Sequence, residues 1–314
     1  MDEFSLVARN TVEVITEEEL RLLLESPRRR VYAGYEPSGE IHLGHLVTVQ
    51  KLLDMQQAGF EVTLLLADLH AFLNRKGTLE EVAELAEYNR RCFEALGLHD
   101  VHYALGSDLQ LRAEYELMVL RLSQQITLNR AARSMDEVGR QMENPTVSQM
   151  IYPIMQMVDI AMLGVDAAVG GIDQRKIHML AREYLPSIGY PAPLCVHTPI
   201  LLGLDGEKMS SSKGNYISIA DGAETILKKM ERAFCPPATQ GNPVLQMMQY
   251  HVFPRFAEVV IRRPKKYGGD RMFGSYAELE VAYAEGRLHP QDLKKACACY
   301  LAEMLAEVRD RMGR

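Results

Sequence analysis

One stretch of sequence decides the fold: Tyr32-Ala33-Gly34-Tyr35-Glu36-Pro37-Ser38-Gly39-Glu40-Ile41-His42-Leu43-Gly44-His45. It opens within the apolar run Val31–Tyr35, which has the length and composition of a short buried strand. Pro37-Ser38-Gly39 is a turn sequence, and a helical pattern then runs from about Leu43 to Ala58 before Gly59. A strand that leads through a turn into a helix is the opening unit of a parallel α/β sheet.

The same alternation of strands and helices continues through the first 220 residues. Strand-length apolar runs follow at 62–67, 101–105 and 165–169, and the capping boxes Thr16/Glu19 and Thr78/Glu81 predict two helix starts. A further helix is expected over 174–185. Two long helical stretches, at about 112–133 and 146–163, indicate an insertion that crosses from one half of the sheet to the other.

We therefore predict an α/β fold with two domains. Residues 1–220 form a Rossmann-like parallel sheet in a nucleotide-binding, catalytic domain, with a helical connective insertion at about 106–145. Residues 221–314 form a mainly helical C-terminal domain, in which 259–270 is an exposed segment rich in Arg, Lys, Pro and Gly.

Composition excludes several classes of protein. Of the 314 residues, 47% are hydrophobic and 25% are charged, which is the globular average rather than that of a disordered or fibrous chain. No apolar run reaches the roughly 20 residues of a membrane span, and the acidic N-terminus does not resemble a signal peptide. The five cysteines form no disulfide or zinc pattern. We expect a cytoplasmic enzyme with no membrane contact.

The net charge of −7 conceals an asymmetry between the two parts of the chain. Residues 221–314 carry 15 basic and 12 acidic residues, whereas residues 1–220 carry 20 and 30. The basic residues of the C-terminal part are clustered, notably at 262–266. Such clusters are most often solvated faces, so this pattern is only a weak indication of a nucleic-acid partner.

Two histidines follow the first strand, where ligands of open parallel sheets bind. His42 and His45 fall on one side of the first helical turn, and Gly44 between them allows a flat ring to approach closely. A helix N-terminus attracts anions, so two imidazole donors there favour a phosphate site. Two partly exposed histidines, or half of a metal site, remain as alternatives at this point; no third metal ligand follows at metalloprotease spacing.

A second motif bears on the same question. Residues 203–215, Gly-Leu-Asp-Gly-Glu-Lys-Met-Ser-Ser-Ser-Lys-Gly-Asn, form a glycine- and serine-rich loop with lysines at Lys208 and Lys213. The spacing is not that of a P-loop, and an isolated loop of this kind would be an ordinary surface turn. A mobile loop can nevertheless bring a lysine onto a charged transition state.

Together the two motifs resemble the signatures of class I aminoacyl-tRNA synthetases. His42-Leu43-Gly44-His45 is similar to their "HIGH" element, and Lys208-Met209-Ser210-Ser211-Ser212 to their "KMSKS" loop. Ser211 stands where the bacterial-type loop has a second lysine, which resembles the archaeal and eukaryotic branch and leaves Lys208 and Lys213 to supply the charge of the loop. The similarity extends from Tyr32 to His289.

A polar stripe on an apolar helix indicates the substrate. Asn144-Pro145 predicts a helix start, and Tyr152, Gln156 and Asp159 then share one face at i, i+4 and i+7. Buried polar groups of this kind need partners, which are either other core groups or a small zwitterionic ligand.

Residue by residue, the chain resembles the tyrosyl-tRNA synthetases of the archaeal and eukaryotic type. The resemblance implies that Tyr32 and Asp159 hold the phenolic oxygen of L-tyrosine and that Tyr152, Gln156 and Gln174 surround its amino group. Gly34 and Glu36 complete the implied tyrosine site. The implied ATP site comprises His42, Gly44, His45, Asp173, Lys208, Met209, Ser210 and Ser211, of which His42, His45 and Lys208 are catalytic.

The resemblance also implies partners. The reaction would join tyrosine to tRNA(Tyr) through tyrosyl-adenylate, with ATP as substrate, Mg²⁺ on the pyrophosphate and no metal site of the protein's own. The C-terminal domain would bind the anticodon through Tyr267, His289 and Asp292, whereas Arg133 and Arg175 would meet the acceptor end. Residues 118–135 resemble the interface of a homodimer.

Three alternatives compete with this interpretation. Tryptophanyl-tRNA synthetases share the Pro-Ser-Gly-x-x-His-x-Gly-His stretch, but a carboxylate at Asp159 favours a phenol over an indole. Small nucleotidyltransferases also use His-x-Gly-His, in chains about half as long without the Lys208 loop. A non-catalytic RNA-binding homologue would have little reason to keep His42, His45 and Lys208 together.

Overall fold

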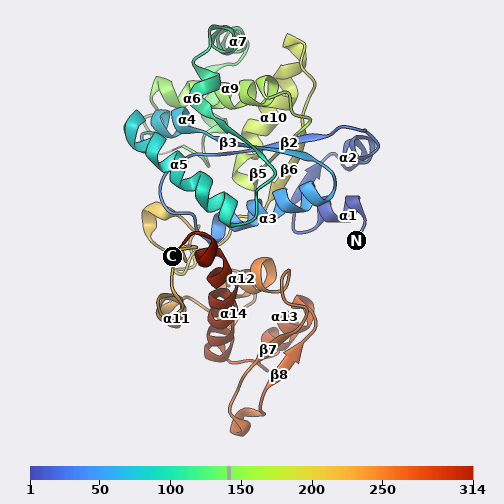
Figure 1. The fold of residues 1–314 in the computed structure, drawn as a ribbon, viewed down its shortest axis with the longest axis vertical. Coiled ribbons are helices and arrows are strands. Elements are labelled where there is room, and N and C mark those ends of the chain that lie inside the picture. Colours follow the sequence, from blue (N-terminus) through green and yellow to red (C-terminus); the bar gives the residue numbers. More distant parts are fainter. Residues whose placement is uncertain (140–142, 314) are drawn as a thin grey trace. The chain divides into compact units, whose positions relative to one another are not determined.

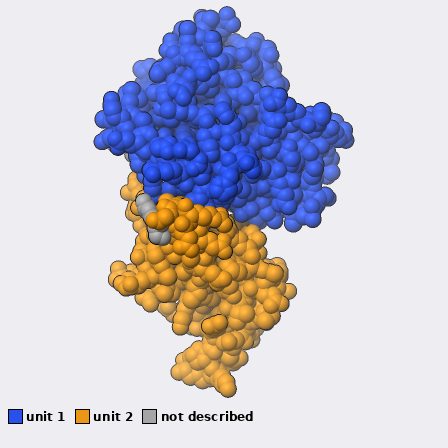
Figure 2. Space-filling view, in the orientation of Figure 1, with its two compact units in different colours: residues 1–39, 48–199 blue, residues 40–47, 200–314 orange. Residues whose placement is uncertain are grey.

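A computed structural model describes residues 1–139 and 143–313, so three residues of the predicted insertion (140–142) and Arg314 lie outside the described residues. The chain forms two compact units (Figure 2). The first unit comprises Met1–Gly39 and Thr48–Pro199, and the second comprises Glu40–Val47 and Ile200–Arg314. The expected boundary at 220 thus falls inside the second unit. Its segment 41–43 pairs with 217–219, through Leu43 N to Ile217 O (3.1 Å) and Ile219 N to Ile41 O (3.1 Å).

A six-stranded sheet forms the centre of the first unit (Figure 1). Its order is β1-β6-β5-β2-β3-β4, and every pairing is parallel except that of β1 with β6. The strands are β1 (Glu13–Ile15), β2 (Arg30–Tyr35), β3 (Glu61–Leu66), β4 (His102–Leu105), β5 (Ala167–Gly171) and β6 (Leu194–Thr198). The predicted α/β class is confirmed, with one antiparallel edge strand that was not expected.

Helices cover both faces of this sheet, as the burial of its central strands requires. Figure 1 shows α9 and α10 on one side and α3 and α5 on the other. The helices are α1 (Glu3–Ala8), α2 (Glu17–Leu24), α3 (Leu43–Gln57), α4 (Asp68–Leu73), α5 (Leu79–Ala95), α6 (Gly106–Gln110), α7 (Ala113–Ser123), α8 (Leu128–Ser134), α9 (Val147–Met162) and α10 (Arg175–Tyr184). Both predicted capping boxes, at the starts of α2 and α5, are present.

The order of the strands places the functional segments. From β2, the chain winds outward through β3 to β4 at one edge, and then crosses back through α6–α9 to β5 on the other side of β2. The winding direction therefore reverses between β2 and β5, and ligands of such sheets bind beyond the carboxyl ends of the strands at that reversal. Residues 34–36 and 171–174 end these two strands.

Three local expectations were wrong. The helix expected at about 112–133 is two helices, α7 and α8, with a break between them. A new helix begins after the break because the Thr127 side chain accepts a hydrogen bond from Arg130 N and caps α8. The helix expected to start at Asn144-Pro145 starts at Val147, where Thr146 and Gln149 form a capping box. The strands β1 and β6 were missed; β1 is only three residues long and gains its partner from a distant part of the chain.

The second unit is mainly helical, as predicted. Its helices are α11 (Ala223–Arg232), α12 (Pro243–Met247), continued by a π-helical turn (Met248–Val252), α13 (Tyr276–Ala284) and α14 (Pro290–Arg311). A short hairpin of β7 (Val259–Ile261) and β8 (Arg271–Phe273) joins them. The segment expected to be exposed from 259 begins with a strand in which Val259 and Ile261 are buried, so the exposed part starts after β7. Among the described helices, none combines the length and the apolar character of a membrane span.

Candidate active site

The first cluster of polar side chains lies in the first unit, and we call it the Asp159 pocket. It joins Tyr32 in the middle of β2 to Asp159 on α9, and both side chains are fully buried. The buried residues of α9 are otherwise mostly apolar, so its polar side chains are held where water does not reach. Burial, followed by the charge of Asp159, raises the pKa of Tyr32 and keeps its hydroxyl proton in place.

Two side chains from other elements orient the Asp159 carboxylate. Its Oδ1 atom accepts hydrogen bonds from Gln110 Nε2 (2.8 Å) and Tyr115 Oη (2.8 Å). Tyr115 Oη also lies 2.7 Å from Met155 O. Burial raises the pKa of Asp159, while the two donors and His70 oppose that shift. The carboxylate is thus fixed in orientation before any ligand binds.

His70 completes this pocket from α4. Gln110 Nε2 lies 3.1 Å from His70 Nδ1, and because an amide nitrogen only donates, that imidazole nitrogen accepts. The proton of the neutral ring is therefore on Nε2, which lies 3.7 Å from Asp159 Oδ2. Both of these buried atoms lack a hydrogen-bond partner among the described residues. One acceptor and one donor thus face the same small volume.

The other end of the pocket carries a second set of polar groups. Gln156 Nε2 donates to Gln174 Oε1 at 3.2 Å. Glu36 pairs with Lys76 and accepts from Asn74 Nδ2 (3.2 Å). Burial, followed by Glu36, raises the pKa of Tyr152. Four of the predicted tyrosine-site residues, Glu36, Tyr152, Gln156 and Gln174, are therefore linked to one another in pairs.

Three side chains around Asp159 were not predicted from the sequence, namely His70, Gln110 and Tyr115. They come from α4, α6 and α7, between 44 and 89 positions away from Asp159, and no local spacing connects them. One signal was present for His70: a buried aspartate and histidine directly follow β3, at the edge of the sheet where ligands bind.

The second cluster lies in the second unit, at the first turn of α3. His42 Nδ1 accepts from Gly44 N (3.2 Å), and His45 Nδ1 accepts from His42 N (3.2 Å). In the neutral rings, the proton of each is consequently on Nε2. Burial, with a smaller effect of His45, lowers the pKa of His42 to about 2. His42 is therefore neutral, and the Nε2 atom of each ring is an N–H donor at a helix N-terminus.

The Lys208 loop belongs to the same cluster. Met209 is buried, and its Sδ atom lies 3.2 Å from Gly44 N. A Cβ atom on Gly44 would approach the His42 ring to 3.0 Å and Met209 Sδ to 3.4 Å, so a side chain there would require the imidazole ring to move by a few tenths of an ångström. Ser211 and Lys213 bound a 3₁₀ turn that follows Ser210. The structure thus brings the two sequence signatures, 165 residues apart, into contact.

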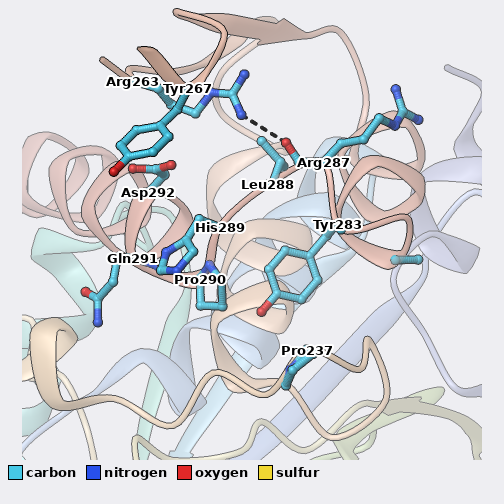
Figure 3. Close-up of a pocket in the computed structure, with 12 residues that line it drawn as sticks. Pro237, Arg263, Tyr267, Tyr283, Arg287, Leu288, His289, Pro290, Gln291 and Asp292 are labelled. Carbon is cyan, nitrogen blue, oxygen red and sulfur yellow. Dashed lines mark hydrogen bonds between the residues drawn. The ribbon is translucent and has the colours of Figure 1, made fainter. Parts of the chain in front are cut away.

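A third cluster is an open pocket of about 810 Å³ in the second unit, which we call the Asp292 pocket (Figure 3). Asp292 lies in the first turn of α14, and His289 caps that helix through its Nδ1 atom, which accepts from Gln291 N (3.2 Å). Tyr267, 61% exposed, stands on the 3₁₀ turn after β7, on the same side of the pocket as Asp292. Arg263 Nη1 donates to Arg287 O (2.9 Å) and links the two walls. The three predicted anticodon residues therefore line one pocket.

The remaining predicted residues lie outside these clusters or at their edges. Arg133, on α8, and Arg175, on α10, are exposed, and Arg175 Nε donates to Glu13 Oε1 at 2.7 Å. Asp173 lies in the 3₁₀ turn (Ile172–Gln174) directly after β5. Gly34 is exposed, and a Cβ atom there would meet the Tyr32 ring at an ordinary 3.5 Å.

The mostly parallel sheet, the His42–His45 pair at the first turn of α3 and the Lys208 loop are the features of a class I tRNA synthetase. A family model described as "tRNA synthetases class I (W and Y)" matches residues 25–306. This class contains the enzymes for tryptophan and tyrosine.

Individual relatives decide between the two. The chain is 72% identical to a tyrosine–tRNA ligase of Methanoculleus marisnigri and 70% identical to that of Methanospirillum hungatei, over 99% of this chain and 98% and 99% of those proteins. A crystal structure of the tyrosyl-tRNA synthetase from Archaeoglobus fulgidus, complexed with L-tyrosine, matches with a TM-score of 0.96 and 57% identity over 99% of both chains. The chain belongs to the tyrosyl-tRNA synthetase family and is an ATP-dependent aminoacyl-tRNA ligase; the tryptophan alternative is not favoured.

Proposed function

We propose that the Asp159 pocket binds L-tyrosine. The main support for this assignment is a pair of buried polar atoms. Asp159 Oδ2 and His70 Nε2 are buried, 3.7 Å apart and without a hydrogen-bond partner among the described residues. A phenolic hydroxyl donates one hydrogen bond and accepts others, so it matches this pair. Tyr32, whose hydroxyl is also buried, is the third group for the phenolic oxygen.

This arrangement supports discrimination against phenylalanine. A site built to bond a hydroxyl leaves buried polar groups unpaired when the hydroxyl is missing, which can reject the analogue by ~10⁴–10⁵-fold without editing. The groups at the other end of the pocket, Tyr152, Gln156 and Gln174, supply oxygens for the substrate ammonium group. Gly34 and Glu36 border the same site, where Glu36 is held by Asn74 and Lys76.

We propose that ATP is held by the second cluster. In the reaction, a carboxylate oxygen of tyrosine attacks the α-phosphorus of ATP, the bond to the bridging oxygen breaks, and pyrophosphate leaves with the electron pair. His42 and His45 would donate Nε2–H to phosphate oxygens, and Lys208 would place a positive charge on them. Gly44, Met209, Ser210 and Ser211 shape this site, and Asp173 would bond the adenosine ribose.

Mg²⁺ is proposed to arrive on the phosphates of ATP. Among the described residues there is no cluster of three or more His, Cys, Asp or Glu side chains arranged to hold a metal, and Mg²⁺ is commonly bound through substrate phosphates. The bound cation would neutralise charge on pyrophosphate. His42, His45 and Lys208 act on the same phosphates without a metal ligand among them.

The tyrosyl group is then proposed to pass to tRNA(Tyr). A ribose hydroxyl of the terminal adenosine attacks the adenylate carbonyl, and AMP leaves. The Asp292 pocket suits the anticodon, because an exposed aromatic ring can stack on a base while a carboxylate accepts hydrogen bonds from a guanine edge. Arg133 and Arg175 are exposed cations suited to the acceptor end.

A homodimer and a cytoplasmic location belong to the same proposal. Residues 118–135 overlap α7 and α8, where Leu117, Leu120 and Leu128 are 49%, 61% and 74% exposed. Exposed leucines on adjacent helices favour a protein interface. All five cysteines are free, which suits a reducing compartment.

Pyrophosphate exchange tests the assignment of activation. ATP–pyrophosphate exchange measured with each of the twenty amino acids should be fast with tyrosine alone. His45→Ala should slow adenylate formation by ~10²–10³-fold and leave the Kd for tyrosine nearly unchanged, because the donor acts mainly on the transition state. His99→Ala, at an exposed histidine, is the matched control. An unchanged rate in His45→Ala would contradict the phosphate assignment.

A further inference from the structure

The Lys208 loop, although rich in glycine and serine, is held by regular backbone hydrogen bonds. Lys208 pairs with Leu202 in an isolated β-bridge, and Met209 N donates to Leu201 O at 3.0 Å. The next pair inward, Gly203 N to Glu207 O, is 2.6 Å. Lys208 therefore stands on the returning arm of a small hairpin, just before the 3₁₀ turn Ser211–Lys213.

One side chain binds both the tip and the returning arm of this hairpin. The carboxamide of Asn215, in a residue only 7% exposed, donates from Nδ2 to Asp205 Oδ1 (2.8 Å) and to Lys208 O (3.2 Å). Its Oδ1 atom accepts from Ser210 N at 2.9 Å. Both amide hydrogens and the amide oxygen of Asn215 are thus hydrogen-bonded. One hydrogen bond reaches the tip of the hairpin, and the other two reach the residues on either side of Met209.

The backbone is shaped around this carboxamide. Asn215 O accepts from Leu204 N at 2.8 Å. A Cβ atom on Gly203 would lie 2.3 Å from Asn215 Nδ2 and 2.6 Å from Asn215 O, so only glycine fits there. The hydrogen bond from Asn215 lowers the pKa of Asp205 and keeps that carboxylate ionised as an acceptor.

We propose that Asn215 is a positioning residue that fixes the backbone of the Lys208 loop for ATP activation. The inference rests on the proposed role of Lys208 at the ATP phosphates. Because Asn215 fixes both Lys208 O and Ser210 N, it sets the backbone position of Met209, whose sulfur contacts Gly44 N. The Lys208 side chain then extends from a fixed backbone, so less conformational entropy is lost when it is positioned in the transition state.

The matched test compares two buried asparagines of the second unit. Asn215→Ser keeps a hydroxyl oxygen as an acceptor but removes the two N–H donors that bind Asp205 Oδ1 and Lys208 O. Asn242→Ser is the control, because Asn242 is buried as well and its three shortest hydrogen bonds are comparable: it donates to Pro236 O (3.0 Å) and accepts from Val244 N (3.0 Å) and Leu245 N (3.2 Å). Both variants should lose stability to a similar degree.

Kinetics separate positioning from stability. At saturating tyrosine, Asn215→Ser should lower kcat/KM for ATP in pyrophosphate exchange by ~10–100-fold, the loss of one to two well-placed hydrogen bonds, and leave the calorimetric Kd for tyrosine within about twofold. Asn242→Ser should keep the parental kcat and KM for ATP. Equal ATP kinetics in the two variants would overturn the inference.

An exchange of the two interacting side chains provides a rescue. Asn215→Asp alone places a carboxylate against Lys208 O and Asp205 and should be worse than Asn215→Ser. In the double variant Asp205→Asn/Asn215→Asp, the new amide at 205 can donate to the new carboxylate at 215, so activity should partly return. Asp205→Ala, at an exposed residue, should cost about threefold and remains measurable if the variants at 215 do not fold.

Lys208→Gln distinguishes this inference from the proposed function. A parental exchange rate in Lys208→Gln would overturn the role of Lys208 and the inference with it. A slow Lys208→Gln enzyme together with normal ATP kinetics in Asn215→Ser would overturn only the positioning role.

Discussion

Two aspartates of this enzyme, both proposed to bind ligands, differ in how the structure holds them. Asp159 is fully buried on α9, with Gln110 and Tyr115 donating to one of its oxygens. Asp292 is partly exposed in the first turn of α14, beside a Tyr267 ring that is 61% exposed. The Asp159 carboxylate is held by two donors without any ligand, whereas the proposed anticodon pocket would have to order an exposed side chain on binding.

The two environments predict different degrees of specificity. If the Asp159 pocket binds tyrosine as proposed, an amino acid without a hydroxyl leaves buried polar atoms without partners, and that penalty is large. In the Asp292 pocket, water can replace a missing partner, so each contact contributes less. The proposed assignments thus predict a stringent choice of amino acid and a graded choice of RNA.

The largest expected effect is at the buried carboxylate. Asp159→Ala should weaken the preference for tyrosine over phenylalanine by ~2–4 kcal/mol, because the phenolic proton loses a charged acceptor. The measurement is the ratio of kcat/KM values for the two amino acids in pyrophosphate exchange. Asp136→Ala, at an exposed aspartate of the same unit, is the control. Discrimination that survives in Asp159→Ala would make Asp159 a purely structural residue.

A smaller effect is expected at the open carboxylate. Asp292→Ala should slow charging of tRNA(Tyr) at subsaturating tRNA by ~5–150-fold, the loss of one or two hydrogen bonds to a base, and leave pyrophosphate exchange unchanged. Asp310→Ala, at the exposed far end of α14, makes the same change in charge. Should Asp292→Ala charge as the parent does, Asp292 would only stabilise the helix N-terminus, by ~0.3–1 kcal/mol.

A third prediction concerns the donors that orient Asp159. Tyr115→Phe removes one of the two hydrogen bonds to Asp159 Oδ1 and leaves the ring in place. The tyrosine-to-phenylalanine preference should fall by ~2–10-fold, the value of a single hydrogen bond and less than in Asp159→Ala. Tyr103→Phe, which removes a bond to Leu98 O far from α9, is the control. No change in preference would show that Gln110 alone orients the carboxylate.

The smallest effect is on stability and depends on pH. Burial raises the pKa of Asp159, so the folded state holds this proton more tightly than the unfolded state does. The resulting contribution to stability is present at low pH and is lost as pH rises through the folded pKa. Asp159→Asn should therefore raise Tm relative to the parent at pH 8, and the gain should shrink as pH falls. A gain of Tm that is independent of pH would contradict the burial of an ionised carboxylate.

Much of the fold was predictable because its signals are local. The capping boxes of α2 and α5 satisfy backbone groups within three residues, and the strand β2 and the helix α3 follow from short apolar patterns. The strands that were missed lacked such a local signal. The strand β1 has three residues and exists through its pairing with β6, about 180 positions away, which no short window can indicate.

The candidate site divides in the same manner. His42, Gly44, His45 and Lys208 were recognisable from residue type and spacing, as was the stripe that includes Asp159. The groups that act on these residues were not, because Gln110 and Asn215 have no distinctive pattern in the sequence. Their importance arises only from what they contact.

The class of enzyme and its substrate followed from the sequence through two short motifs and a position-by-position resemblance to a known family. The state of the individual side chains could be read only from the folded structure. Other parts of the chain decide each of these states. Gln110 sets the proton position on His70, and Asn215 fixes the backbone of Lys208. Burial by the surrounding elements raises the pKa of Asp159. The physical reason is that hydrogen bonds and desolvation act over a few ångströms of space, whatever the distance along the chain.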